Sequence, residues 1–267
     1  MSNKDKQATL TKTNQPAPVQ VSHQQAARAS SPSQSPTTPA KANMVDLTQR
    51  RRVFFNIAAA ILLVGTIIML FFVVLAGSQP SNPLNRLYYL EVKLTSLNYP
   101  SPDKTVRWTT WNICGVQDGK NVHCSKNQAG HTYDPAKQVP DAQPPLPGSV
   151  LEHSAESATA SRIFFSFLVL SIITAFITLA VTPGGCLGRW GCIFCLYSSL
   201  GMLFFLGIAA VTATVVYSNA RDRYRHNGID AKLGPSVFAF LWTSVACNLL
   251  ATAAFAYASV RSPPAKK

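Results

Sequence analysis

Four long runs of apolar residues, none of which contains a charged side chain, dominate the pattern of the chain. The uncharged stretches are Val53–Asn85, Ile163–Gly188, Trp190–Ala220 and Leu233–Val260. A helix needs about 20 apolar residues to cross the hydrocarbon core of a bilayer. Lipid offers no hydrogen-bond partner to an open backbone, so each run must form a helix. The pattern predicts four spans, at about residues 53–77, 162–182, 191–217 and 235–260.

The composition agrees with a membrane protein. Charged residues make up 13% of the 267 residues, about half the share of a soluble domain, and a globular surface needs charges to stay in water. We therefore expect a mainly α membrane domain over residues 51–260, built as a left-handed four-helix bundle. The first run is too long for the apolar segment of a cleaved signal peptide, and a long polar stretch precedes it.

Basic residues beside the spans predict the orientation, because cytosolic flanks carry an excess of Lys and Arg. Arg50, Arg51 and Arg52 stand directly before the first run. We therefore expect both termini in the cytosol, with the long loop 78–161 outside. The third loop opposes this assignment, because its four basic residues outnumber its two acidic ones. The triple arginine at the first span decides in favour of cytosolic termini.

Residues 1–50 are rich in Gln, Ser, Thr, Ala and Pro, and such a cytosolic tail buries too little apolar surface to fold. Residues 261–267 form a second, short cytosolic tail. Three Ser-Pro or Thr-Pro pairs and one serine near Arg28 suggest phosphorylation at Ser30, Ser31, Ser35 and Thr38, although chance pairs in a solvated tail give the same pattern. Arg50, Arg51 and Arg52 would bind anionic inner-leaflet lipids, at roughly 1 kcal/mol each, or would only fix the topology.

The long loop has the pattern of a small β-sheet. Leu90–Thr95 alternates apolar and polar side chains, Val106–Ile113 is rich in aromatic and β-branched residues, and Asn121–Cys124 is a short third candidate. We expect a strand at each of the three segments.

Two cysteines of this loop, Cys114 and Cys124, flank an Asp-Gly pair, which is a strong hairpin signal. A three-residue turn centred on Gly119 would place them opposite each other, within the range that a disulfide accepts, and an exported loop is oxidising. The rival hypothesis is a metal site that adds His123 or His131, but the spacing typical of such sites is absent.

The segment that carries these cysteines resembles a known family. Arg107-Trp108-Thr109-Thr110-Trp111-Asn112-Ile113-Cys114, followed by Cys124, is similar to the signature of the fungal PalI and Sur-seven group. Its members are four-span plasma-membrane proteins, several of them associated with eisosomes. The same pattern resembles the first-loop motif of the claudin superfamily, although no Gly-Leu pair precedes Trp111. The resemblance implies a plasma-membrane location and a claudin-like bundle with a disulfide-pinned extracellular sheet. Trp111 itself would fill the core of that sheet or sit among lipid headgroups.

A second group of cysteines, Cys186, Cys192 and Cys195, lies at the predicted cytosolic turn and the start of the third span. Cysteines beside the membrane on that side are candidates for S-palmitoylation. The alternative is that Cys serves there as a small apolar residue in a tight turn.

The spans contain no Asp, Glu, Lys, Arg or His, whereas ion-coupled transporters and pumps place such residues at bilayer depth. No catalytic arrangement, cofactor or nucleic-acid site is indicated. Small residues in the third span, such as Gly207, favour close helix packing.

We expect a non-enzymatic protein that forms a homo-oligomer or lateral assembly with lipids and with other membrane or cortical proteins. The resemblance implies the organisation of a membrane domain in cell-wall integrity or endocytosis. It leaves two alternatives, a PalI-like accessory subunit of ambient-pH signalling and a claudin-like pore subunit.

Overall fold

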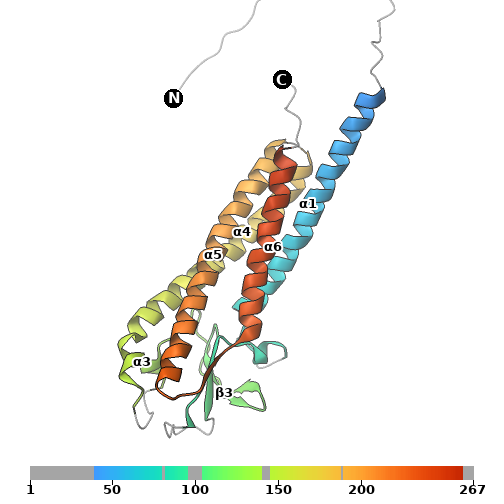
Figure 1. Ribbon diagram of the computed structural model, residues 1–267. Coiled ribbons are helices and arrows are strands. Elements are labelled where there is room, and N and C mark those ends of the chain that lie inside the picture. The colour runs from blue at the N-terminus through green and yellow to red at the C-terminus, as the bar shows by residue number, and fades with distance from the viewer. Residues whose placement is uncertain (1–38, 80–81, 96–103, 140–144, 188, 261–267) are drawn as a thin grey trace, which may run out of the picture. The chain divides into compact units, whose positions relative to one another are not determined.

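The computed structural model describes residues 39–79, 82–95, 104–139, 145–187 and 189–260. Among these residues, those from Asn43 onward form one compact unit. Its four long helices run side by side, with a small sheet at one end (Figure 1). The helices are α1 (Pro39–Val74), α4 (Ser154–Leu187), α5 (Arg189–His226) and α6 (Pro235–Val260). All four are long and apolar enough to cross a membrane, which confirms the four-span architecture.

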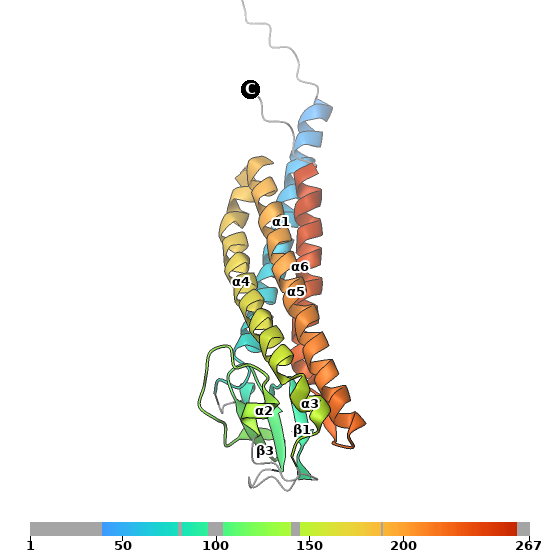
Figure 2. The ribbon, with the colours of Figure 1, turned by 90° about the vertical axis from the view of Figure 1, so that its left-hand side faces the viewer.

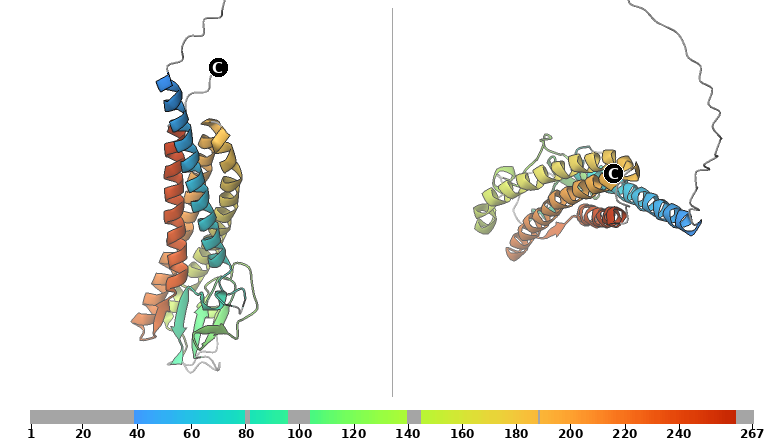
Figure 3. Two further views of the ribbon diagram at one scale, coloured as in Figure 1. Left: turned by 90° about the vertical axis from the view of Figure 1, so that its right-hand side faces the viewer. Right: turned by 90° about the horizontal axis from the view of Figure 1, so that it is seen from above.

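Three helices are longer than the predicted spans, and α1 begins at Pro39, well before the first apolar run. Helix α4 begins at Ser154 and α5 ends at His226, because the polar turns beyond the apolar runs stay helical. Helix α5 packs against both α4 and α6 (Figure 3). The short helices α2 (Pro135–Gln138) and α3 (Gly148–Glu152) lie at the sheet end of the bundle (Figure 2).

The sheet has five antiparallel strands in the order β4-β3-β2-β1-β5. They are β1 (Leu90–Lys93), β2 (Thr105–Trp108), β3 (Ile113–Gln117), β4 (Lys120–Val122) and β5 (Ala231–Leu233). The expected single strand over Val106–Ile113 is wrong, because a turn at residues 109–112 divides it into β2 and the start of β3. Strand β5 comes from the loop between α5 and α6, so the sheet joins two loops that are far apart in the sequence.

An aromatic cluster connects the sheet to the helices. Tyr89 stacks on Tyr217 of α5 at a centroid distance of 4.8 Å, and Trp108 meets Tyr133 edge to face at 5.3 Å. Trp108 and both of these tyrosines from the loop are almost completely buried. The buried residues of the bundle and of the sheet form one continuous core, so the sheet packs directly on the ends of the helices.

Inside the bundle, a buried polar cluster joins α5 to α6. Ser199 donates to Asn248 Oδ1 at 3.2 Å and lies 2.6 Å from Thr252 Oγ1. All three side chains are buried. They satisfy one another in a region where lipid would offer no hydrogen bonds.

We expect Asn248→Ala to lower the free energy of unfolding by about 1 kcal/mol, because it removes the acceptor of an interhelical hydrogen bond. Ser259→Ala is the matched control, since the Ser259 hydroxyl donates only within its own helix, to Ala256. Thermal unfolding of the purified protein in detergent measures both. An equal loss for the two variants would contradict the interhelical role of Asn248.

Candidate functional site

The disulfide of the outer sheet joins Cys114 and Cys124, with their Cα atoms 4.0 Å apart. The hairpin between the two cysteines differs from the expected one. Gln117 pairs with Lys120 across a two-residue turn, in which Asp118 and Gly119 both have positive φ, 51° and 72°. These angles are typical of the type I′ turn that Asp-Gly favours. The predicted three-residue turn is therefore wrong.

One extra residue restores the predicted opposition of the cysteines. Gly115 pairs with Val122, and this register alone would place Cys114 opposite His123. His123 has φ 46° and acts as a β-bulge, which adds one residue to its strand. Beyond it, Ser125 N–H donates to the Ile113 carbonyl at 2.8 Å. The register is shifted by one residue, and Cys124 comes to lie against Cys114.

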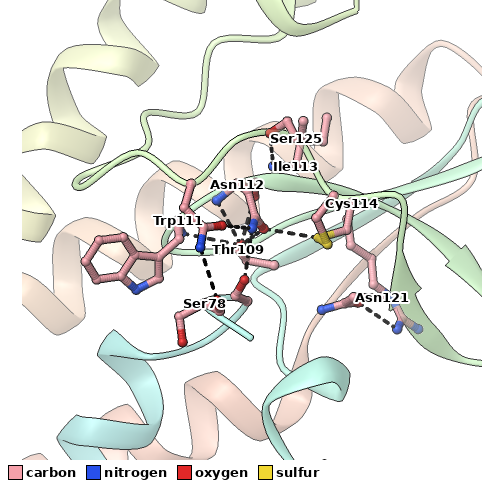
Figure 4. Close-up of a disulfide and its surroundings, with 12 residues drawn as sticks. Ser78, Thr109, Trp111, Asn112, Ile113, Cys114, Asn121 and Ser125 are labelled. Carbon is pink, nitrogen blue, oxygen red and sulfur yellow. Dashed lines mark hydrogen bonds between the residues drawn. A yellow bond between two sulfur atoms is a disulfide. The ribbon is translucent and has the colours of Figure 1, made fainter. Parts of the chain in front are cut away.

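The segment just before Cys114 holds the end of α1 that lies nearest the sheet (Figure 4). The last carbonyls of a helix have no partner within it. Here the turn between β2 and β3 supplies the donors. Thr110 Oγ1 donates to the Val73 carbonyl at 2.8 Å, and Trp111 Nε1 donates to the Val74 carbonyl at 2.6 Å. Asn112 Nδ2 donates to the Gly77 carbonyl at 2.9 Å, and Thr110 N–H donates to the Ala76 carbonyl at 3.2 Å.

We call this set of hydrogen bonds the seat of the sheet. Thr109 fixes its geometry, because its hydroxyl donates to the Asn112 carbonyl at 2.8 Å and accepts from the Asn112 N–H at 3.2 Å. Trp111 is half-buried, with its ring edge to face with Phe165 of α4. Trp111 thus bonds to the end of α1 and packs on α4, and the expected place in the sheet core belongs to Trp108.

The comparison with known proteins agrees with this architecture and motif. Residues 55–254 match the SUR7/PalI family. The chain belongs to the SUR7/PalI family. It is similar to the SUR7 family protein FMP45 of Saccharomyces cerevisiae, with 32% identity over 72% of this chain and 62% of that protein. It is also similar to the uncharacterized plasma membrane protein YNL194C of the same organism, with 27% identity over 68% of this chain and 61% of that protein. Protein SUR7 of Candida albicans is 25% identical over 74% of this chain and 70% of that protein.

The chain thus spans less than two thirds of the length of the two Saccharomyces cerevisiae relatives. The SUR7/PalI match extends from α1 to α6, so it includes the four spans, the sheet and the seat. The protein is therefore a multi-pass membrane protein of a family with a member named for the plasma membrane.

Arg107, which begins the SUR7/PalI motif, is the centre of a buried polar network. Its guanidinium bonds to Glu91 Oε2 through Nε at 2.8 Å and Nη2 at 2.7 Å. Nη1 donates to the Gly119 carbonyl at 2.9 Å, and Cζ lies 4.2 Å from the centre of the Tyr88 ring. Burial and the Glu91 carboxylate raise the pKa of the Tyr88 phenol, and Arg107 partly opposes this rise. One side chain therefore ties together β1, β2 and the hairpin turn.

Trp108, the next motif residue, faces the other side of the strand. Its indole Nε1 donates to Gln138 Oε1 at 2.7 Å, and its ring lies 6.4 Å from that of Tyr224 on α5. Gln138 Nε2 in turn lies 2.9 Å from His131 Nε2. Burial lowers the pKa of His131, which favours the neutral imidazole. Among the residues that the structure describes, no three His, Cys, Asp or Glu side chains are grouped as a metal site would require.

The cysteines at the other end of the bundle lie inside the helix packing. Cys192 and Cys195 have no exposed surface. Cys192 Sγ lies 3.9 Å from Asn56 Nδ2 of α1, and Cys195 Sγ lies 3.4 Å from the Val181 carbonyl of α4. Either side chain would have to leave these contacts before it could accept an acyl chain. The side chain of Cys186 and the sites Ser30, Ser31, Ser35 and Thr38 lie outside the described residues, so palmitoylation and phosphorylation stay predictions.

Proposed function

We propose that the protein is a non-enzymatic organiser of a plasma-membrane domain of the eisosome type, with a role in cell-wall integrity or endocytosis and with both termini in the cytosol. In this function copies associate laterally and gather lipids and cortical proteins around them. The seat is the observation that carries the proposal. Because Thr110, Trp111 and Asn112 bond to the end of α1, a contact made by the outer sheet is transmitted to the spans without a flexible joint.

The inner end of α1 supports contact with anionic lipids. Arg50 and Arg51 are exposed. A groove of about 430 Å³ lies beside them, lined by Gln49, Arg50, Val53, Phe54 and Ile57. A guanidinium next to apolar side chains suits a lipid phosphate and the first part of its acyl chain. The proposed assembly would therefore include anionic lipids of the cytosolic leaflet.

A notch on α5 supports lateral association of the spans. Gly207 has open space where a side chain would begin. Phe204 and Val211, one turn away on either side, are 62% and 53% exposed. A glycine between two exposed large side chains lets a neighbouring helix approach closely. Ala209 and Ala213, by contrast, are fully buried and pack within the bundle.

We expect Gly207→Leu to reduce clustering at the cell surface, because the new side chain starts in open space and fills the notch. Gly65→Leu on α1 is the matched control, since Gly65 also has open space beside it. Fluorescence recovery after photobleaching of tagged full-length protein measures clustering. Immobile patches that persist in Gly207→Leu and dissolve in Gly65→Leu would contradict the assignment to α5. Free diffusion of the unmodified protein would contradict the proposed function itself.

A further inference from the structure

A polar cleft opens beside the disulfide, between the end of α1 and the edge of the sheet. Its volume is about 310 Å³, at the small end of the range for ligand pockets, ~300–1,000 Å³. One wall is residues 77–79, directly after the first span, and the opposite wall is residues 121–125 with Asn127. The cleft therefore lies between the segment that follows the first span and the edge of the sheet, and its size suits a small headgroup.

Amide and hydroxyl side chains predominate in the walls of the cleft. Six amide or hydroxyl side chains line the cleft, namely Ser78, Gln79, Asn112, Asn121, Ser125 and Asn127. Figure 4 shows Ser78, Asn112, Asn121 and Ser125 around the disulfide. The lining contains no Asp, Glu, Lys or Arg, and His123 is its one titratable side chain. A phosphate or carboxylate would lose its hydration there without meeting a Lys or Arg side chain, so the six amide and hydroxyl side chains favour a neutral ligand.

Several of these side chains keep hydrogen-bonding capacity after their contacts within the protein. Asn127 donates one N–H to the Ser78 carbonyl at 3.1 Å and accepts from Asn112 at 2.6 Å, which leaves one N–H and one lone pair. Asn121 uses one N–H on the Leu87 carbonyl and has a second. Among the residues that the structure describes, the exposed Gln79 amide makes no hydrogen bond.

We propose that this cleft binds a neutral sugar ring. Each hydroxyl of a sugar both donates and accepts, and amide and hydroxyl side chains offer both functions in turn. Val122 and the disulfide sulfur of Cys124 give the cleft an apolar surface for the C–H face of the ring. The ring can be the headgroup of a glycolipid in the adjacent leaflet or the end of a free oligosaccharide. This inference goes beyond lateral organisation and holds or fails independently of it.

The test measures binding to the purified full-length chain in nanodiscs, in two arms. The first arm titrates soluble tetrasaccharides of glucose, mannose and N-acetylglucosamine. The second compares nanodiscs of phosphatidylcholine made with and without glucosylceramide in the same bilayer as the protein. Binding in the first arm assigns a free oligosaccharide as the source, and binding in the second arm alone assigns a glycolipid headgroup. Binding in neither arm overturns the proposal.

Two variants of one residue place the binding in this cleft. Gln79→Ala is expected to weaken binding about fivefold, the effect of one lost hydrogen bond. Gln79→Trp is expected to abolish binding by covering the cleft. Gln79 is exposed and has no hydrogen bond to the described residues, so neither change disturbs the fold. Gln117→Ala is the control, because Gln117 is an exposed glutamine at the end of β3 and away from the cleft. Equal affinity of the Gln79 and Gln117 variants for the sugar that binds would overturn the assignment to this site.

Discussion

Replacing Arg107 by Met is expected to lower the free energy of unfolding by about 3 kcal/mol, which is the low end of the loss when one partner of a buried ion pair is removed. The low end applies because the Arg107 and Glu91 side chains keep 9% and 13% of their exposure. The change leaves the Glu91 carboxylate buried without its cation and removes the donor to the Gly119 carbonyl. Thermal unfolding in detergent measures the loss, and surface delivery of a tagged copy reports it in cells.

The double variant Arg107→Met with Glu91→Gln separates the two causes. It removes the uncompensated charge, so it is expected to be more stable than Arg107→Met alone. Arg107→Lys keeps the charge but lacks the planar group that reaches Glu91 and Gly119 together, and an intermediate stability is expected. If the double variant were less stable than the single one, the loss would come from packing and not from the stranded carboxylate.

Replacing Gly77 by Ala is expected to cost about 2–4 kcal/mol, the sum of left-handed backbone strain and overpacking. Gly77 has φ 81°, and a Cβ atom there would overlap the Thr109 side chain. Thr109 cannot retreat easily, because it holds the turn that donates to the end of α1. The variant should therefore displace the seat, loosen the outer sheet and lower the unfolding temperature.

Gly65→Ala is the matched control for Gly77→Ala. Gly65 lies inside α1 with no atom near the position of the new Cβ. Alanine is the better helix former by up to about 1 kcal/mol, so this change is expected to stabilise the protein slightly. The two glycine replacements should therefore have opposite signs. A stabilising effect of Gly77→Ala would refute the close contact with Thr109.

The local pattern of residues was sufficient to predict the four spans and the pairing of the disulfide. The uncharged runs predicted four helices because only closed backbones are stable in lipid. The Asp118–Gly119 pair predicted the hairpin, since both residues tolerate positive φ. The bulge at His123 has no such signal in the sequence. The expected pairing of Cys114 with Cys124 was therefore correct although the expected turn was wrong.

The seat and β5 could not be predicted in the same way. Val106–Ile113 has strand composition throughout, but the Thr109 hydroxyl competes for backbone hydrogen bonds and makes a turn. The role of Trp111 depends on where α1 ends in space, and only a glycine just past the apolar run, Gly77, hints at that end. Strand β5 is three residues long, and its partner β1 is far away in the sequence.

The basic residues of the third loop opposed the expected orientation. In the structure, charged residues of this loop make contacts with the sheet. Lys232 lies opposite Glu91 in the pairing of β5 with β1. Arg225 Nε donates to the Ala231 carbonyl at 2.8 Å. Asp230 pairs with Lys93 at 2.7 Å. The charges of this loop support the sheet, so their number is a weak guide to topology.

The position of β5 also has a consequence for biosynthesis. Strand β1 lies between β2 and β5, so one edge of β1 stays open during translation until Ala231–Leu233 have emerged and α5 has crossed the membrane. An open edge presents a row of unpaired backbone groups, which other chains and chaperones recognise. The edge closes only when the third helix has been inserted in the correct direction. The five-stranded sheet can therefore form only when the loop between α1 and α4 and the loop between α5 and α6 lie on the same side of the membrane.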